Sequence, residues 1–131
     1  MSLLISHTTR SYPSLPYQTI KDAIVGKSYQ LSLVFIGAKR AQVINQTYRN
    51  KQTVPDVLSF PLADEVGEIY LCLPQIKKTY PQFPHTYNEH VGFLFIHGLL
   101  HLKGYEHGAT MEKAERRYSN RYIFLKNHSL T

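Results

Sequence analysis

The histidine-rich segment HGLLHLKGYEH, residues 97–107, constrains the fold of this chain more than any other feature. His97 and His101 are four residues apart, so a helix would place both imidazoles on one face, on successive turns. Gly104 can adopt the left-handed conformation that ends a helix, after which the chain can fold back and deliver His107 to the same place. This spacing predicts a metal site on a central helix and the loop after it. Zinc is the expected ion, because imidazole nitrogen is one of its common ligands.

The number of ligands separates a catalytic zinc from a structural one. A structural zinc takes four protein ligands, whereas three leave the fourth position open to water. His90 lies seven residues before His97 on the same helical face and could be a fourth ligand. Packing in the core or against a ligand is the favoured role for His90. We therefore expect one catalytic zinc per chain, bound by His97, His101 and His107.

The hydrophobic pattern predicts a single α+β domain over residues 1–131. Runs of branched and aromatic residues indicate strands at residues 2–8, 29–36, 56–60 and 68–73, with 29–36 at the centre. Apolar residues at helical spacing indicate helices at residues 16–25, 38–48, 86–103 and 111–126. Residues 74–84 are expected to form a loop with one helical turn. The result is a small mixed sheet packed against helices.

The net charge indicates the kind of partner, and the cysteine content indicates the cellular compartment. Fifteen Lys and Arg against nine Asp and Glu give a net charge of +6, which favours an anionic partner such as nucleic acid. A merely basic, solvated surface is the alternative. Cys72 is the only cysteine, so no internal disulfide can form and a reducing compartment is expected. No signal peptide or membrane-spanning run is visible, so the chain is expected to be cytoplasmic and free of the membrane.

The histidine spacing also matches the zinc signature of the metzincin proteases, H-E-x2-H-x2-G-x2-H. Their glutamate is the general base that activates water for peptide cleavage. Gly98 stands at that position here, and glycine has no side chain to accept a proton. A protease of this design is therefore not expected.

Four blocks of sequence resemble the bacterial rRNA-maturation endoribonucleases, the YbeY family. Residues 97–107 are similar to the family signature H-G-x-L-H-L-x-G-Y-D-H. NQTYR at 45–49 and DVLSFP at 56–61 are similar to its N-x2-Y-R and T-D-V-L-S-F-P blocks. GEIYLC at 67–72 is similar to its G-D-I pattern. All of these matches occur in the family's order.

The resemblance implies a cytosolic, zinc-dependent endoribonuclease that is specific for single strands. It further implies a role in 16S rRNA 3′-end maturation and ribosome quality control, with single-stranded RNA, rRNA and the small ribosomal subunit as partners. The zinc ligands would be His97, His101 and His107. The family's arginine falls on Arg49, whose planar fork could bind two phosphate oxygens and stabilise their charge. Attack by zinc-activated water and attack by the ribose 2′-OH both remain open.

The sequence departs from the family blocks at several positions. Glu106 and Glu68 replace aspartates and keep their charge on a longer side chain. Glu106 is predicted to accept a proton or to hydrogen-bond a zinc ligand; a solvated glutamate is the alternative. Pro55 replaces a threonine, which removes a hydroxyl and a backbone donor beside Asp56. Asp56 itself is expected to make local hydrogen bonds rather than to act in catalysis.

Basic residues on the last predicted helix suggest a path for RNA. Lys113, Arg117 and Arg121 recur every four residues and so form one cationic stripe, which is expected to bind phosphates. A solvated face is the alternative for this stripe. Further basic residues close to Arg49 could extend the surface, namely Lys39, Arg40 and Lys51.

Two other functions are compatible with a zinc site. The first is a different zinc hydrolase, including a metzincin-like protease that takes its base from elsewhere, such as Glu106. The second is a non-catalytic ribosome-assembly factor stabilised by zinc. Gly98 argues against the first, and the open coordination position argues against the second.

Overall fold

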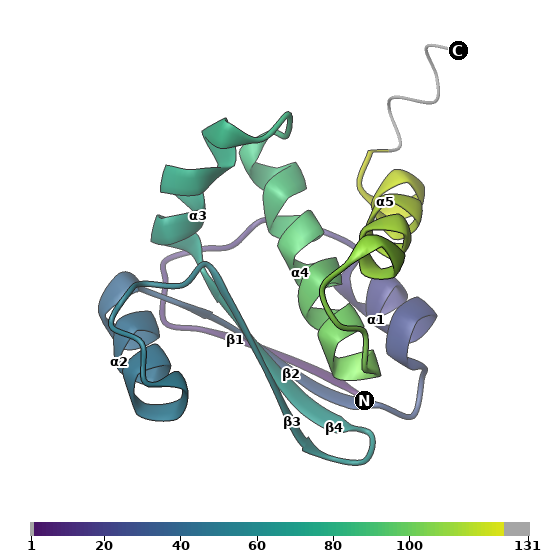
Figure 1. The fold of residues 1–131 in the computed structure, drawn as a ribbon, viewed down its shortest axis with the longest axis horizontal. Coiled ribbons are helices and arrows are strands. Elements are labelled where there is room, and N and C mark those ends of the chain that lie inside the picture. The colour runs from purple at the N-terminus through teal and green to yellow at the C-terminus, as the bar shows by residue number, and fades with distance from the viewer. Residues whose placement is uncertain (1, 125–131) are drawn as a thin grey trace.

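A four-stranded mixed sheet forms the centre of the computed structural model, which describes residues 2–124 (Figure 1). The strand order is β1-β2-β4-β3, formed by β1 (Leu3–His7), β2 (Gln30–Ile36), β4 (Val66–Cys72) and β3 (Val57–Ala63). β1, β2 and β4 are parallel, whereas β3 pairs antiparallel with β4 as a hairpin. The predicted α+β class is confirmed, and β2 lies inside the sheet as expected.

Helices cover both faces of the sheet. Figure 1 shows α1, α4 and α5 on one side and α2 on the other. The long helices are α1 (Tyr17–Val25), α2 (Ala38–Arg49), α4 (Tyr87–Lys103) and α5 (Ala109–Tyr122). The predicted end of the last helix, at residue 126, lies outside the described residues. Within residues 2–124, none of the helices is both long and apolar enough to cross a membrane.

Capping interactions define both ends of helix α4. The Thr86 hydroxyl accepts a hydrogen bond from the Glu89 amide, and the Glu89 carboxylate accepts one from the Thr86 amide. At the other end, Gly104 has a φ of 108° and ends the helix in the left-handed region. These signals place His97 and His101 in the last turns of one continuous helix, as the sequence predicted.

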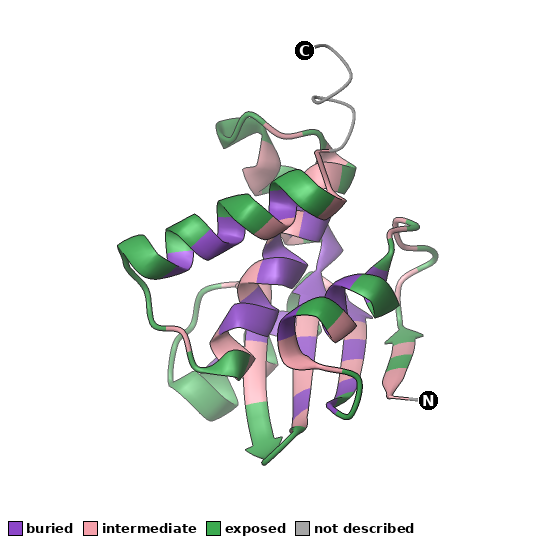
Figure 2. Ribbon diagram, turned by 90° about the vertical axis from the view of Figure 1, so that its right-hand side faces the viewer, coloured by how far each residue is buried: buried purple, intermediate pink, exposed green. Residues whose placement is uncertain are grey.

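The core lies mainly between the sheet and α4. Alternate residues of the central strands point towards α4, namely Leu31, Leu33, Phe35, Ile69 and Leu71. Three α4 side chains that meet them are fully buried, namely Val91, Phe95 and Leu99. Figure 2 shows this alternation as buried bands along the strands and exposed residues at the tip of the hairpin. A smaller core on the opposite face joins Ile36, Ala41 and Cys72 beneath α2.

A short helix replaces most of the predicted loop at residues 74–84. Helix α3 (Leu73–Thr79) is followed by the 3₁₀ helix η1 (Tyr80–Gln82). Pro74 lies in the first turn of α3, where a missing backbone amide breaks no helical hydrogen bond. Leu73 and Ile76 bury one side of the helix. The prediction of a loop with one helical turn was wrong, because the segment forms two helices, α3 and η1. From sequence alone, a proline in the first turn of a helix cannot be told from a proline that ends one.

The β3–β4 hairpin is longer than predicted. β3 continues through Pro61 to Ala63, with a register irregularity between them, and β4 already begins at Val66. A proline is tolerated there because β3 is an edge strand. The turn lies nearer the hairpin tip, where Glu65 has a φ of 57°.

Candidate metal site

The three predicted histidine ligands converge at the C-terminal end of α4. One ring nitrogen from each of His97, His101 and His107 lies within 4.8 Å of those of the other two. The Nε2 atoms of His97 and His101 are 3.2 Å apart. His107 follows the turn at Gly104 and is exposed, whereas the other two rings are half-buried. This is the convergence that the spacing predicted.

The chemistry of the three rings suits a metal ion. Metal binding requires neutral imidazoles with lone pairs directed at one point. The Nδ1 atom of His97 is hydrogen-bonded to Glu115, which leaves its Nε2 atom for the cluster. Burial, followed by the charges of His97 and His107, lowers the pKa of His101 and so favours its neutral form. The residues therefore fit a divalent cation that accepts nitrogen ligands.

Glu115 is a site residue that the sequence analysis missed. It lies on the buried face of α5 beside Met111 and Ala114, and the residue is only 7% exposed. Its carboxylate hydrogen-bonds the ring of His97, which fixes the tautomer and orientation of a ligand histidine. A signal was present, because helical spacing from Met111 places a carboxylate on the apolar stripe of this helix.

Glu106 does not occupy that position. It is exposed and lies outside the lining of the histidine cavity. The carboxylate next to a ligand ring is Glu115 on the following helix instead. The proton-accepting role of Glu106 stays a prediction.

The histidines open into a cavity of about 490 Å³ that also includes Arg49. Arg49 is the last residue of α2, and the edge strand β3 closes the space between it and the histidines with Val57, Ser59, Phe60 and Pro61. No carboxylate is among the described residues that line this cavity. The lining therefore favours an anion, and the structure brings together the two parts of the site that the sequence placed far apart.

Gly98 lies where α4 packs closely against β3 and β4. A Cβ atom at this position would be 2.8 Å from Ser59 Oγ and 3.1 Å from Ile69 Cδ1. The Ser59 hydroxyl donates a hydrogen bond to the Gly98 carbonyl oxygen over 3.1 Å. Gly98 therefore allows α4 to pack closely against β3. Because it has no side chain, it also supplies no general base. A glutamate like that of the metzincins would force at least the Ser59 hydroxyl, and with it the hydrogen bond to the Gly98 carbonyl oxygen, to move.

Asp56 and His90 have environments that match their local roles. Burial raises the pKa of Asp56, while backbone hydrogen bonds and the nearby His97 oppose this shift. His90 is buried outside the three-histidine group, with its Nδ1 atom 2.9 Å from Nδ1 of His85. Its ring stacks on Phe83 at a centroid distance of 4.6 Å. His90 thus packs in an aromatic cluster, which was its favoured role.

The basic stripe of α5 is exposed but separate from the histidine cavity. Lys113, Arg117 and Arg121 are all on the solvent side of the helix, and none lines the cavity. The guanidinium groups of the two arginines lie over the rings of Tyr118 and Tyr122, at 5.2 and 5.6 Å. The role of the stripe in RNA binding stays a prediction.

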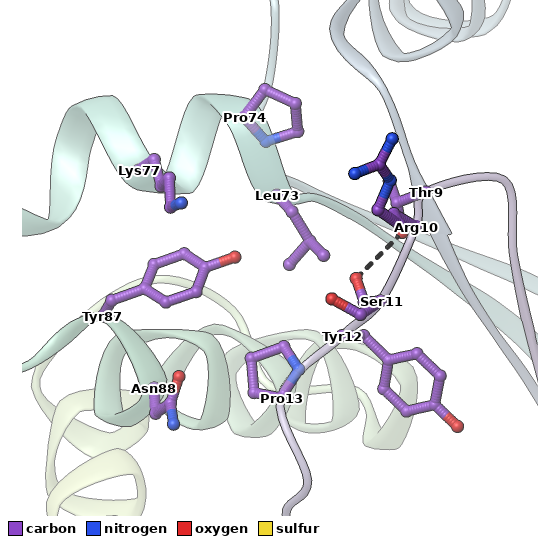
Figure 3. Close-up of a pocket in the computed structure, with 10 residues that line it drawn as sticks. All are labelled: Thr9, Arg10, Ser11, Tyr12, Pro13, Leu73, Pro74, Lys77, Tyr87 and Asn88. Atoms are coloured by element: carbon purple, nitrogen blue, oxygen red, sulfur yellow. Dashed lines mark hydrogen bonds between the residues drawn. The ribbon is translucent and has the colours of Figure 1, made fainter.

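Another cavity of about 490 Å³ lies near the N-terminal end of α4 (Figure 3). Arg10 and Lys77 contribute its positive charge, and Lys77 Nζ is 5.5 Å from the centre of the Tyr87 ring. It includes none of the predicted site residues. The cavity at the other end of α4, with three convergent histidines, is therefore the stronger candidate for catalysis.

Comparisons of the sequence with known proteins point to the same family as the sequence blocks around the three histidines and Arg49. The family model described as Endoribonuclease YbeY matches residues 9–127. The Endoribonuclease YbeY of Staphylococcus carnosus is 31% identical over 123 residues, which cover 85% of this chain and 80% of that protein. That of Mesoplasma florum is 41% identical over 96 residues, but the match covers only 56% of its length and 65% of this chain.

A solved structure shows the same fold. The solution structure of TM1509 from Thermotoga maritima superposes with a TM-score of 0.65 at 26% sequence identity. The match covers 90% of this chain and 87% of that protein.

Proposed function

This chain belongs to the endoribonuclease YbeY family, and from that premise we propose that it is a zinc-dependent endoribonuclease specific for single-stranded RNA. Its proposed task is the maturation of the 3′ end of 16S rRNA and ribosome quality control in the cytoplasm, with the small ribosomal subunit as its partner. One observation carries the proposal: Arg49 and the three histidines line a single cavity.

The histidines would hold the metal and Glu115 would hold one of them in place. His97, His101 and His107 supply the nitrogen ligands, and three ligands leave room for water or substrate. Zinc in such a site acidifies water and polarises phosphoryl oxygens. Glu115 keeps the Nδ1 proton of His97 engaged, so that the Nε2 lone pair faces the other rings.

Arg49 would bind the phosphate group that is cut. Its guanidinium presents parallel N–H groups that match two phosphate oxygens. No described carboxylate lines the cavity to compete for it. Charge that develops on the phosphate during cleavage would therefore be stabilised by the Arg49 cation.

The test compares substrates and one variant. Zinc-loaded protein is incubated with a single-stranded precursor of the 16S 3′ end, with a perfect RNA duplex, and with an unstructured polypeptide. We expect cleavage of the single strand alone. His101→Ala should lose the zinc and the cleavage together. Cleavage of the polypeptide, or undiminished RNA cleavage by the zinc-free variant, would contradict the proposal.

A further inference from the structure

A cavity of about 380 Å³ lies between α2 and the outer face of the β3–β4 hairpin. We call it the aromatic groove, because three of its lining residues are Tyr48, Phe60 and Tyr70. Arg40 and Glu68 add polar groups to the same lining. No step of the proposed cleavage uses this groove.

The rings are held in place by the elements that carry them. Arg40 and Tyr48 are eight residues apart on α2 and therefore lie on one side of the helix. Phe60 pairs with Glu68 in the hairpin register, so both point to the same face as Tyr70. The Tyr48 and Phe60 rings meet edge to face at 5.7 Å, as do those of Phe60 and Tyr70 at 6.0 Å.

Tyr48 is unusually exposed for an aromatic residue. The residue is 72% accessible, and its ring contact is with Phe60. Deeper in the groove, the Tyr70 hydroxyl donates a hydrogen bond to Glu68 Oε1 over 3.1 Å. The groove thus offers an exposed ring face at its rim and hydrogen-bonding groups inside, which are the features that a nucleobase uses.

The aromatic groove is continuous with the histidine cavity. Phe60 and Pro61 line both spaces, and Tyr48 directly precedes Arg49 in the chain. A phosphate at Arg49 would therefore have its attached nucleoside at the edge strand β3, beside the groove. Arg40 and Glu68 have opposite charges within the groove, so Arg49 in the adjoining cavity is the cation that favours a nucleic acid over a neutral peptide.

We infer that the aromatic groove binds the nucleobase next to the phosphate held at Arg49. This inference rests on the proposed function and gives it a substrate subsite. A base can enter the groove only if it has left its own stack and pair, which single-stranded RNA permits and a duplex resists. Preference for single strands would then come from base capture at Tyr48 rather than from the metal centre.

The test measures binding, so it does not depend on cleavage. Labelled oligo(U) and an abasic ribose-phosphate oligomer of equal length are titrated at one salt concentration, with their intactness checked on a gel. Wild-type protein should bind oligo(U) about 5-fold or more tightly than the abasic oligomer, the lower end of what stacking on one ring gives. Tyr48→Ala should bind the two oligomers equally, whereas Tyr48→Trp should keep the preference.

Val43→Ala is the matched control, because Val43 is also exposed on α2 but lies outside the aromatic groove. It should bind both oligomers as the wild type does. Equal binding of the two oligomers by the wild type would overturn the inference. A Tyr48→Ala variant that keeps the preference would overturn it, as would one weakened equally for both oligomers. Tyr48-dependent binding of an unstructured peptide alone would make the groove a peptide site and would also overturn it.

The cleavage assay separates this inference from the proposed function. Preference for oligo(U) that depends on Tyr48, without cleavage of the 16S precursor, would support the base site and contradict the endoribonuclease. Cleavage without that preference would overturn the base site alone.

Discussion

Glu115 on α5 accepts a hydrogen bond from the Nδ1 atom of His97 on α4, which joins the last two helices at the candidate metal site. The carboxylate is nearly buried, so it is held in one position by the packing of α5. Because this hydrogen bond at Nδ1 already orients the His97 ring, the ring would lose little conformational freedom when its Nε2 atom binds a metal. The packing of α5 on α4 therefore fixes the orientation of the His97 ring.

Removing the charge of Glu115 should weaken metal binding without unfolding the protein. Glu115→Gln keeps the shape of the side chain but is a poorer acceptor for His97. We expect a zinc affinity about 10- to 100-fold lower, the usual effect of losing a hydrogen-bond partner of a metal ligand. Competition with a chromophoric chelator measures it. Asp64→Asn, at the exposed tip of the β3–β4 hairpin, should bind zinc normally. Equal affinities for the two variants would refute this role.

Arg49 should matter for cleavage but not for metal binding. Arg49→Ala should retain one zinc per chain, because Arg49 is not a ligand, and should lose about 10²–10³ in the single-turnover rate of RNA cleavage. Lys51→Ala removes an exposed charge close by and should have a much smaller effect. A wild-type cleavage rate for Arg49→Ala would show that Arg49 is an ordinary surface residue with no role in cleavage.

Side chains at Gly98 should destabilise the fold through crowding against β3. A Cβ atom would lie 2.8 Å from Ser59 Oγ, so Gly98→Ala should cost about 1–2 kcal/mol although alanine favours helices. Gly98→Glu should cost more and should create no peptidase. Gly98→Ala in a Ser59→Ala background is the control, since it removes the atom nearest to the added Cβ and should cost less than the sum of the two single changes. Urea unfolding would decide, and a Gly98→Ala variant more stable than wild type would contradict the crowding.

His90 should make the protein sensitive to acid. Burial, together with the charge of His85, lowers the pKa of His90 to about 4, against 6.5 for the ordinary group. The unfolded chain therefore binds this proton at a higher pH than the folded one. Stability is complete above about pH 6.5 and falls towards pH 4, by at most about 3 kcal/mol.

Replacing the titrating group tests this directly. His90→Phe should flatten the dependence of unfolding free energy on pH between 4 and 6.5, measured with a chelator present to keep metal out. His7→Asn removes an exposed histidine and should leave the slope as in wild type. If His90→Phe kept the full wild-type slope, the acid sensitivity would have another source.

The basic stripe of α5 should contribute to RNA affinity through charge. Replacing Lys113, Arg117 and Arg121 by Gln should leave zinc content and melting temperature nearly unchanged, because all three are exposed. The slope of log K against log salt should flatten by up to about two units, near 0.7 for each lost phosphate contact on a single strand.

A second triple variant tests whether RNA affinity depends on the position of the α5 stripe or only on the net charge of the protein. A control with Gln at Lys27, Lys77 and Lys78 removes the same charge from other exposed positions. It should keep a salt slope close to that of wild type. The same slope for both triple variants would show that the α5 stripe is only a solvated face.

The convergence of the three histidines could be predicted from sequence because it depends on local geometry. His97 and His101 share a helical face, and the turn at Gly104 returns His107 to them, so no tertiary contact had to be known. Residue spacing puts Glu115 on the apolar stripe of α5, but its contact with His97 depends on how α5 packs against α4, which spacing does not encode. Arg49 came from the family resemblance for the same reason, because α2 and α4 meet at the site only through the folded sheet.

Errors in the fold prediction had a common physical source. The predicted strand at 56–60 ends just before Pro61 and the predicted loop at 74–84 begins at Pro74, yet both prolines lie inside elements. An edge strand needs no amide hydrogen on its open side, and the first turn of a helix needs none at all. Whether a proline interrupts an element therefore depends on its neighbours in space.

The turn at Gly104 has a consequence for the order of folding. Only the segment from His97 to His107 must be ordered to bring the three ligands together, whereas β2 and β4 pair residues from distant parts of the chain. Loop-closure entropy rises with the length of chain enclosed, so bringing His97 and His107 together costs less than pairing β2 with β4. Metal is thus expected to bind during refolding before the parallel strands pair, and to act as a nucleus around which α4 meets the sheet.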